Sequence, residues 1–404
     1  MSGQQVFFNI LRPVFTRRGI VLNIARRYAS KKKLEASMGG IFEPFLSNTL
    51  DSTGQQDISP KQWLSKKTVQ GIDLLPDQHQ LELLIQHKQI HLAIEKQQAL
   101  VKHVLDHIAN DTPVDTNQVL DLVDKDVSQL VSFGNIVLKM SQYGAPVALE
   151  LYRIAMEKGD DRGAFSYANM IYRGYRGTPK NEERGVQIMS QLAQKGHPYA
   201  QMNLAAIIMR TQPSRVDAAI QLYELAGRAG VDSAYTELGR MYRHGFGIHQ
   251  DHVKAVEYFK QGAQSGNPQC NFMLGVYHSS NLIGEPDQQK AFKYFQKAAV
   301  KGMPEAQYNV GLRFLRGHGV EVNHFNAAEF FRMAALQGFQ LAQINLAGMY
   351  TEGRGVKKDL EEARKWLEKA SASGGKIGKD AQKRIEELDQ IEGKKKNNDR
   401  CNIM

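Results

Sequence analysis

Four histidines lie at a spacing that lets one helical face present two imidazoles. His87 and His91 are four residues apart, and so are His103 and His107. Such pairs can contribute to a zinc site, but the site usually needs a third ligand and a fixed tautomer for each imidazole. Neither pair contains the glutamate of an H-E-x-x-H motif. We therefore interpret both pairs as polar histidines on a solvated helix face, and we expect no metal site.

The other motifs of the chain indicate neither catalysis nor cofactor binding. The stretch GGKIGKD at residues 374–380 lacks the spacing of a phosphate-binding P-loop, and no G-x-S-x-G nucleophile motif is present. The two cysteines, Cys270 and Cys401, are too few for a disulfide framework. Cys270 occupies a small-residue position, so we expect it to pack as an alanine would. We predict a protein that is not an enzyme and has no cofactor.

The C-terminal residues Cys401, Asn402, Ile403 and Met404 resemble a prenylation box. Three lysines at residues 394–396 could supply the second, basic signal that a single lipid chain needs for stable anchoring. Prenylation of Cys401 would place the protein in the cytosol, at the plasma membrane. This location is kept as an alternative.

The N-terminal segment indicates a different compartment. Residues 1–33 contain eight Lys and Arg and no Asp or Glu, interleaved with large apolar side chains. This composition is typical of a mitochondrial transit peptide. Arg26, Tyr28 and Ala29 resemble a matrix processing site, which has an arginine three residues before the cut, an aromatic directly before it and a small residue after it. We predict that residues 1–28 are a transit peptide and that the mature protein lies in the matrix, where it could associate peripherally with the inner membrane.

Outside this segment the chain is almost neutral. Subtracting the eight positive charges from the net charge of +10 leaves +2 for the other 371 residues. This body lacks the basic footprint of a nucleic-acid-binding protein. The longest apolar run covers about six residues, from Leu204 to Met209, which is too short to span a membrane. We therefore expect protein partners and no nucleic acid.

A period of about 36 residues organises most of the chain. A glycine ends each predicted first helix, at residues 159, 196, 230, 266, 302, 338 and 374. A small residue opens each predicted second helix, at residues 164, 200, 234, 270, 306 and 342. A period this steady indicates stacked helical hairpins, because one hairpin cannot bury both of its faces alone.

The repeated pattern A-x-x-Y-F-x-x-A-A-x-x-G-x-x-x-A-x-x-x-L-G-x-x-Y-x-x-G-x-G-V resembles the Sel-one-like repeat, a relative of the tetratricopeptide repeat. The units between His252 and Asp359 match best. The resemblance implies an all-α fold, an alpha-alpha superhelix of about six and a half hairpins that acts as an adaptor. Two connections depart from the pattern, IIMRTQPSRV (207–216) and YHSSNLIGEPD (277–287), and we interpret them as altered loops in intact hairpins.

We predict five regions along the chain. They are the transit peptide (1–28), a flexible linker (29–60), a helical N-terminal region (61–144), the repeat solenoid (145–388) and a basic disordered tail (389–404). Within the helical region, the apolar pattern of residues 77–111 fits either one long helix or two. Asp115 or Thr116 is placed to cap the next helix.

The resemblance and the N-terminal address together imply an adaptor for membrane-complex subunits or their assembly factors. Repeat proteins of this kind in fungal mitochondria assist export of cytochrome oxidase subunit 2, so we expect a role in assembly, membrane insertion or export of respiratory-chain subunits. The alternative resembles fungal family members that carry a prenylation box and activate chitin synthase at the cell cortex. A hydrolase within the solenoid is a third hypothesis. The client, the binding face and the oligomeric state stay open.

Four polar residues are candidates for partner binding. They lie on predicted first helices, opposite the apolar stripe, and are Lys260, Lys293, Gln296 and Arg332. We expect them to contribute many weak contacts along an extended wall of the solenoid.

We predict that the mature protein begins at Ala29, or at Ser30 if one further residue is trimmed. N-terminal sequencing of the protein purified from its own cells measures this directly. A protein that still begins at Met1 or Ser2 would contradict the matrix location.

Overall fold

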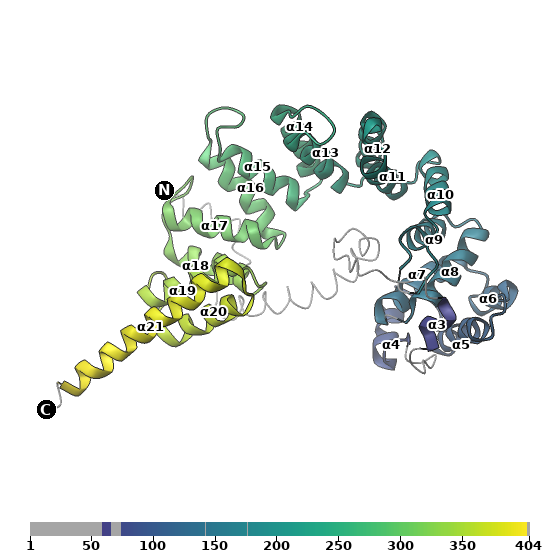
Figure 1. Ribbon diagram of the computed structural model, residues 1–404, viewed down its shortest axis with the longest axis horizontal. Coiled ribbons are helices and arrows are strands. Elements are labelled where there is room, and N and C mark those ends of the chain that lie inside the picture. Colours follow the sequence, from purple (N-terminus) through teal and green to yellow (C-terminus); the bar gives the residue numbers. More distant parts are fainter. Residues whose placement is uncertain (1–58, 66–73, 142, 176, 402–404) are drawn as a thin grey trace. The chain divides into compact units, whose positions relative to one another are not determined.

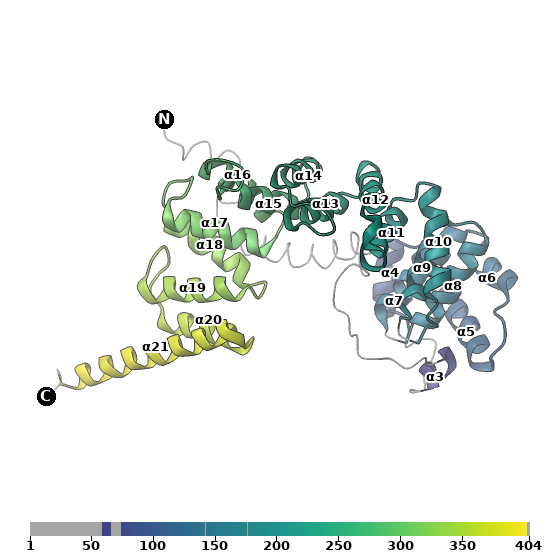
Figure 2. The same cartoon turned by 45° about the horizontal axis from the view of Figure 1, so that its top comes forward.

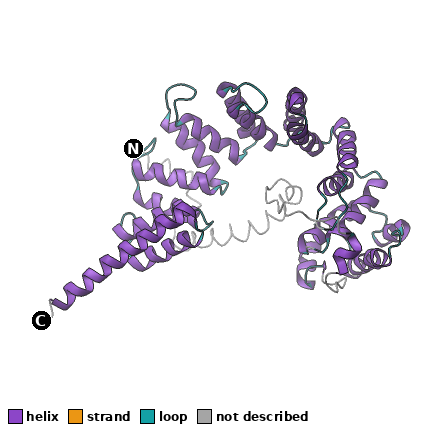
Figure 3. Cartoon of the chain, in the orientation of Figure 1, coloured by secondary structure: helices purple, strands orange, loops and turns teal. Residues whose placement is uncertain are grey.

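The computed structural model describes residues 59–65, 74–141, 143–175 and 177–401, and every regular element within these ranges is helical (Figures 1 and 3). The predicted all-α fold is therefore confirmed. The chain divides after Leu192 into two compact units. The predicted transit peptide, its processing residues and most of the predicted linker lie outside the described residues.

The first unit contains eight of the described helices. They are α3 (Pro60–Ser65), α4 (Gln78–Gln86), α5 (Ile94–Asn110), α6 (Thr116–Leu122), α7 (Val127–Met140), α8 (Ala145–Glu157), α9 (Asp161–Arg173) and α10 (Glu182–Gln194), whose last residues cross the division. The apolar pattern of residues 77–111 forms two helices. The break follows α4, where Lys88 adopts a positive φ of 55°, and Ile90 and Leu92 are buried within the break. Of the two predicted capping residues, Asp115 caps α6. Its Oδ1 accepts a hydrogen bond from the Asn117 backbone N–H at 2.9 Å.

The second unit continues the helical hairpins to the end of the described chain. Its elements are α11 (Pro198–Thr211), the short 3₁₀ helix η2 (Pro213–Arg215), α12 (Val216–Arg228), α13 (Ser233–His244), α14 (His252–Gln264), α15 (Pro268–His278), α16 (Gln288–Val300), α17 (Pro304–Arg316), α18 (His324–Ala335), α19 (Gln340–Glu352), α20 (Leu360–Ala372) and α21 (Gly375–Cys401). Consecutive helices of this unit pack against one another in chain order (Figures 1 and 2).

Each even-numbered helix from α14 to α18 places a phenylalanine against a glycine of the odd-numbered helix before it. A methyl group on Gly275 of α15 would lie 2.8 Å from the Phe295 ring of α16, and one on Gly311 of α17 would lie 2.7 Å from the Phe331 ring of α18. Gly239 has the same relation to Phe259. All three rings are buried. The missing side chain therefore lets each ring lie directly on the neighbouring helix backbone.

A glycine follows the first helix of every repeat, and an Asp or Asn side chain caps α14, α16, α18 and α20, whereas α12 has no side-chain cap. All seven glycines that the sequence places at helix ends have a positive φ, between 70° and 97°, which a residue without a Cβ adopts freely. Asp251 then caps α14 and donates its backbone N–H to the Tyr242 carbonyl at 2.8 Å. The altered loop before α16 closes identically, because Asp287 N–H reaches the His278 carbonyl at 2.8 Å. Both departing connections thus join intact helices, as predicted.

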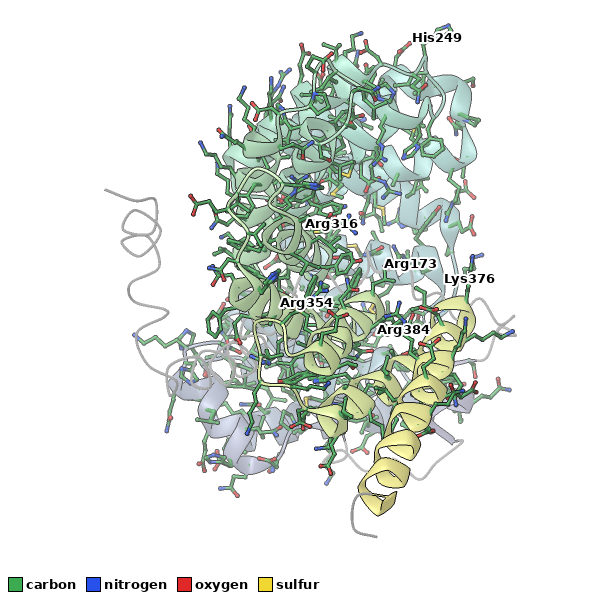
Figure 4. The ribbon with its side chains drawn as sticks, turned by 90° about the vertical axis from the view of Figure 1, so that its left-hand side faces the viewer. Arg173, His249, Arg316, Arg354, Lys376 and Arg384 are labelled. Carbon is green, nitrogen blue, oxygen red and sulfur yellow. The ribbon has the colours of Figure 1, made fainter. Side chains whose placement is uncertain are left out.

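The connection after α17 also ties one repeat to the one before it. A side chain on Gly319 would collide with the Gln288 carbonyl at the start of α16. Arg313, which is 7% exposed, donates to Gln288 Oε1 at 2.8 Å and to the His318 carbonyl at 3.2 Å, and lies 4.9 Å from the centroid of the Phe295 ring. Side chains of the unit are drawn in Figure 4, where Arg316 and Arg354 mark the connections after α17 and α19.

Helix α21 differs from the predicted disordered tail. We expected disorder from residue 389, whereas the backbone is helical from Gly375 to Cys401. Ala381, Ile385 and Leu388 are buried at helical spacing and anchor its first half. The residues that follow include six good helix formers, namely a Gln, a Glu, three Lys and an Arg, and the one glycine among them, Gly393, costs only about 1 kcal/mol. Lys376 and Arg384 mark this helix in Figure 4.

Gly311→Ala should destabilise the protein by about 1–3 kcal/mol, because the added methyl group overpacks the contact with Phe331. Gly348→Ala on α19 is the matched control. Its methyl group would meet nothing within 4 Å, so helix propensity should make it neutral or stabilising by up to about 1 kcal/mol. Urea unfolding of both variants measures the difference. Equal stability of the two variants would show that the glycine–ring contact does not constrain the repeat.

Candidate partner-binding surface

The two histidine pairs are not equivalent in the structure. His87 follows the last residue of α4 and His91 lies between α4 and α5, so the first pair does not share a helix. His103 and His107 both lie on α5, with ring centroids 4.6 Å apart, and His107 Nδ1 is 2.9 Å from Thr112 Oγ1. No group of three or more potential ligands that could hold a metal occurs within the described residues. These pairs therefore form no site with a complete ligand set there.

Cys270 is buried, and its thiol fills the space left by the missing side chain of Gly262. A side chain on Gly262 would collide with Cys270 Sγ, whereas alanines, Ala298 and Ala306, occupy the two equivalent positions of the next repeat. Burial raises the pKa of the Cys270 thiol to about 11, although its contact with Thr236 Oγ1 at 3.2 Å opposes the shift. The thiol is therefore protonated and unreactive near neutral pH. Cys270 packs in an alanine position, as predicted.

Three of the four predicted binding residues share one position of the repeat. Lys260, Gln296 and Arg332 are 36 residues apart on α14, α16 and α18, and Glu224 occupies the corresponding position on α12. We call this the wall position. Lys260 is exposed and Gln296 is half-buried, and the fourth predicted residue, Lys293, is exposed one turn before Gln296.

Arg332 is already bonded within the protein. Its guanidinium pairs with Glu329, one turn earlier on α18, and donates to the Tyr350 hydroxyl at 3.1 Å. It is half-buried. Of the four predicted residues, Arg332 therefore has the largest structural role and the least freedom to reorient toward a partner.

Sequence reasoning missed a row of ring pairs that joins the odd- and even-numbered helices. The pairs are Tyr242 with Tyr258, His278 with Tyr294, and Phe314 with Phe330, and we call them the aromatic ladder. Their centroids are 5.5, 5.4 and 5.8 Å apart, with interplanar angles of 20°, 5° and 23°. The signal was present in the repeat pattern, whose two tyrosine positions recur every 36 residues. Their pairing across helices was not apparent from the pattern.

The first two ladder pairs are accessible and the third is not. All four side chains of the Tyr242 and His278 pairs are half-buried. The rings of the third pair, Phe314 and Phe330, are only 2% and 8% exposed. The accessible part of the ladder therefore extends over α13–α16.

The ladder lies beside the wall position. The Tyr258 hydroxyl donates to Glu224 Oε1 at 2.7 Å, which links α14 to the wall position on α12, and burial together with this bond raises the pKa of Tyr258. One repeat later, burial lowers the pKa of His278, and the nearby positive charges of Lys290 and Lys260 add to the effect while Asp287 opposes it. His278 is therefore mostly neutral at neutral pH. Each of these two ladder pairs thus adjoins the wall residue of the preceding repeat.

Two lysines cover the accessible rings. Lys254 Nζ lies 5.3 Å from the centroid of Tyr242, and Lys297 Nζ lies 5.4 Å from the centroid of Tyr294. A cation at this distance from a ring face is attracted by its quadrupole. The surface of α13–α16 therefore combines half-exposed rings with positive charge.

The chain belongs to the Sel1 repeat family. The model of the Sel1 repeat matches six consecutive segments, at residues 162–197, 198–231, 232–267, 268–302, 304–339 and 340–375, which together make up more than half of the chain. Each matched repeat begins on an odd-numbered helix, so its boundaries differ by one helix from the predicted hairpins while the period is the same. Sel1 repeats generally mediate protein–protein interactions and are generally not catalytic.

Similar proteins agree with this assignment. Human "Protein sel-1 homolog 2" is 34% identical over 105 residues, which is 26% of this chain and 15% of that protein. "Uncharacterized protein NMB1327" of Neisseria meningitidis is 28% identical over 141 residues, 35% of this chain and 29% of that protein. The chain thus matches less than a third of the length of either relative.

One solved structure supports the fold. The protective antigen c5321 of uropathogenic Escherichia coli, which displays an SLR fold, superposes with a TM-score of 0.52 at 22% identity, covering 72% of each chain. Within the ranges that the structure describes, no helix has both the length and the apolar character needed to cross a membrane.

Gly262→Ala alone should destabilise the protein by about 1–3 kcal/mol, because its methyl group collides with the Cys270 thiol. Adding Cys270→Ala should recover most of this loss, since the double variant recreates the alanine pair of the next repeat. A double-mutant cycle of unfolding free energies measures the coupling. Simple additivity of the two changes would refute the size match.

Proposed function

We propose that this protein is a non-enzymatic adaptor of the mitochondrial matrix that binds subunits or assembly factors of membrane complexes through its repeat surface. On this proposal it aids assembly, membrane insertion or export of respiratory-chain subunits, cytochrome oxidase among them. The Sel1 repeats support the adaptor role. The acid-free, arginine-rich composition of residues 1–33 supports the compartment.

The single observation that carries the adaptor role is the accessible ladder beside the wall position on α13–α16. Partly exposed tyrosines contribute large contact area at low entropic cost and keep a polar group for hydrogen bonding. Contacts distributed over several repeats suit a protein partner, which can be held by many weak interactions along a solenoid.

The alternative is a prenylated scaffold of the cytosol and plasma membrane that activates chitin synthase or another membrane enzyme. Cys401 and the lysines at residues 394–396 favour it. The two proposals differ in whether Cys401 carries a lipid, because prenylation takes place in the cytosol. Mass spectrometry of the C-terminal peptide therefore separates them. A prenylated Cys401 would support the scaffold and contradict the matrix adaptor.

Reversing the charge of Lys260, Lys293 and Arg332 to Glu, together with Gln296→Glu, should strongly reduce recovery of partner proteins. The reason is that the substitutions place negative charge on neighbouring even-numbered helices beside the ladder. The measurement is a quantitative pull-down from detergent-solubilised mitochondria. Because Arg332 is bonded to Glu329 and Tyr350, circular dichroism and thermal unfolding must show that the variant is folded.

A matched control reverses three exposed lysines away from this surface, Lys357, Lys358 and Lys376. The control should retain partners as the wild type does. Unchanged recovery of every partner by the wall variant would place the binding surface elsewhere. A wild-type protein that captures no partner at all would overturn the adaptor role itself.

A further inference from the structure

The accessible ladder carries lysines that are not neutralised. Lys254, Lys260, Lys293 and Lys297 have no carboxylate within ion-pair distance among the described residues. Some other basic residues of the same unit do have such partners: Arg228 with Glu224, Arg240 with Glu237, Lys290 with Asp287, and Arg332 with Glu329. Four exposed lysines without a carboxylate partner therefore lie on α14 and α16, the two even-numbered helices of the accessible ladder.

Two of the acidic groups at the ladder are already occupied. Glu224 accepts from the Tyr258 hydroxyl at 2.7 Å through one oxygen and pairs with Arg228 at 3.3 Å through the other. Asp287 caps α16 by accepting from the Lys290 backbone N–H at 2.8 Å and pairs with the Lys290 ammonium at 3.1 Å. Both carboxylates are directed into the protein's own contacts. A third, Glu257 on α14, is exposed, and its charge helps to raise the pKa of Tyr258. The four lysines outnumber this one carboxylate, so net positive charge is left for an external group.

The first ladder pair also has exposed apolar neighbours. Phe246 and Val253 lie between α13 and α14 and at the start of α14, and are 54% and 64% exposed. An apolar side chain of a bound segment would have Phe246, Val253 and the exposed part of Tyr242 within the same hairpin. Burial of such groups would add to electrostatic attraction, which by itself is weak at an exposed surface.

From this arrangement we propose that the α13–α16 ladder binds an extended acidic segment of the partner protein, one in which carboxylates alternate with aromatic or large apolar residues. The carboxylates lie against Lys254, Lys260, Lys293 and Lys297, and the apolar side chains lie on the half-exposed rings. The inference rests on the adaptor role proposed above and names the chemistry of its partner.

A nucleic acid is disfavoured by the same observations. Binding a polyphosphate backbone uses a continuous basic track. Here the chain outside residues 1–33 carries a net charge of only +2, and the unpaired lysines cover two helices. Extended acidic peptides need fewer cations, and alternate side chains of an extended strand point to opposite faces, so one face can meet rings and lysines in turn.

The test measures binding of the purified full-length protein to a short fluorescent peptide of alternating glutamate and phenylalanine. The reference probes are the same peptide with glutamine in place of glutamate, and a single-stranded oligouridylate. The glutamate peptide should bind, the glutamine peptide should bind about tenfold more weakly, and affinity should fall as salt is raised.

Lys254→Gln, Lys260→Gln and Lys297→Gln together should weaken binding of the glutamate peptide about tenfold, because each exposed charge contributes modestly. The control Lys357→Gln, Lys358→Gln and Lys376→Gln removes the same charge elsewhere and should change the Kd less than twofold. These substitutions lie on exposed positions, so circular dichroism should stay unchanged.

Equal binding of both peptides, equal loss in both triple variants, or no binding of the glutamate peptide would overturn the acidic-segment proposal. Stronger, Lys254-dependent binding of oligouridylate would also overturn it, in favour of a nucleic acid. None of these outcomes tests the adaptor role, which the pull-down measures separately. A wild-type protein that still recovers partners while ignoring the peptide refutes the inference alone.

Discussion

The contact between a glycine on one helix and an aromatic ring on the next constrains the rest of the repeat. A ring lying on a glycine backbone holds the two helices close together and defines the rotation of the second helix about its axis. Phe259 and Phe295 are anchored in this way. The residue before each, Tyr258 or Tyr294, then points about 100° away around the helix and meets the ring of the preceding odd-numbered helix. The buried packing therefore positions the surface ladder.

The same constraint explains where the repeats vary. In the α19–α20 repeat, Ala347 stands at the glycine position and Leu367 at the phenylalanine position. The extra methyl group on one helix is thus accompanied by a smaller side chain on the other. At a second contact, Gly262 faces the larger side chain of Cys270, where the next repeat has two alanines. The first unit uses the contact outside the matched repeats, because a methyl group on Gly134 of α7 would lie 2.7 Å from the Tyr152 ring of α8. Size matching between neighbouring helices thus recurs at several contacts of this chain.

Much of the fold was predictable because the period of the sequence is the period of the structure. Glycines at every predicted helix end have positive φ, and both altered loops preserve their hairpins. The sequence left open whether residues 77–111 form one helix or two, because apolar spacing cannot locate a single left-handed residue such as Lys88. The continuation of α21 to Cys401 was not predicted, because the same spacing cannot decide whether a polar stretch stays helical.

The binding surface was predictable only in part, because exposure and pairing depend on the contacts between repeats. Choosing polar residues opposite the apolar stripe of each helix correctly identified Lys260 and Lys293 as exposed. It also selected Arg332, which is held by Glu329 and Tyr350. The same rule did not select Lys254 and Lys297, whose positions over the ladder rings depend on the packing of two helices.

Site-specific photo-crosslinking in living cells tests the central claim most directly. A photoreactive amino acid replaces Tyr294, on the accessible ladder, and in a parallel strain replaces Lys357, in the connection between α19 and α20. The account predicts a discrete adduct with a partner protein from position 294 and none from position 357, with an acidic segment of the partner at the crosslinked site. An adduct formed only from position 357 would contradict the account.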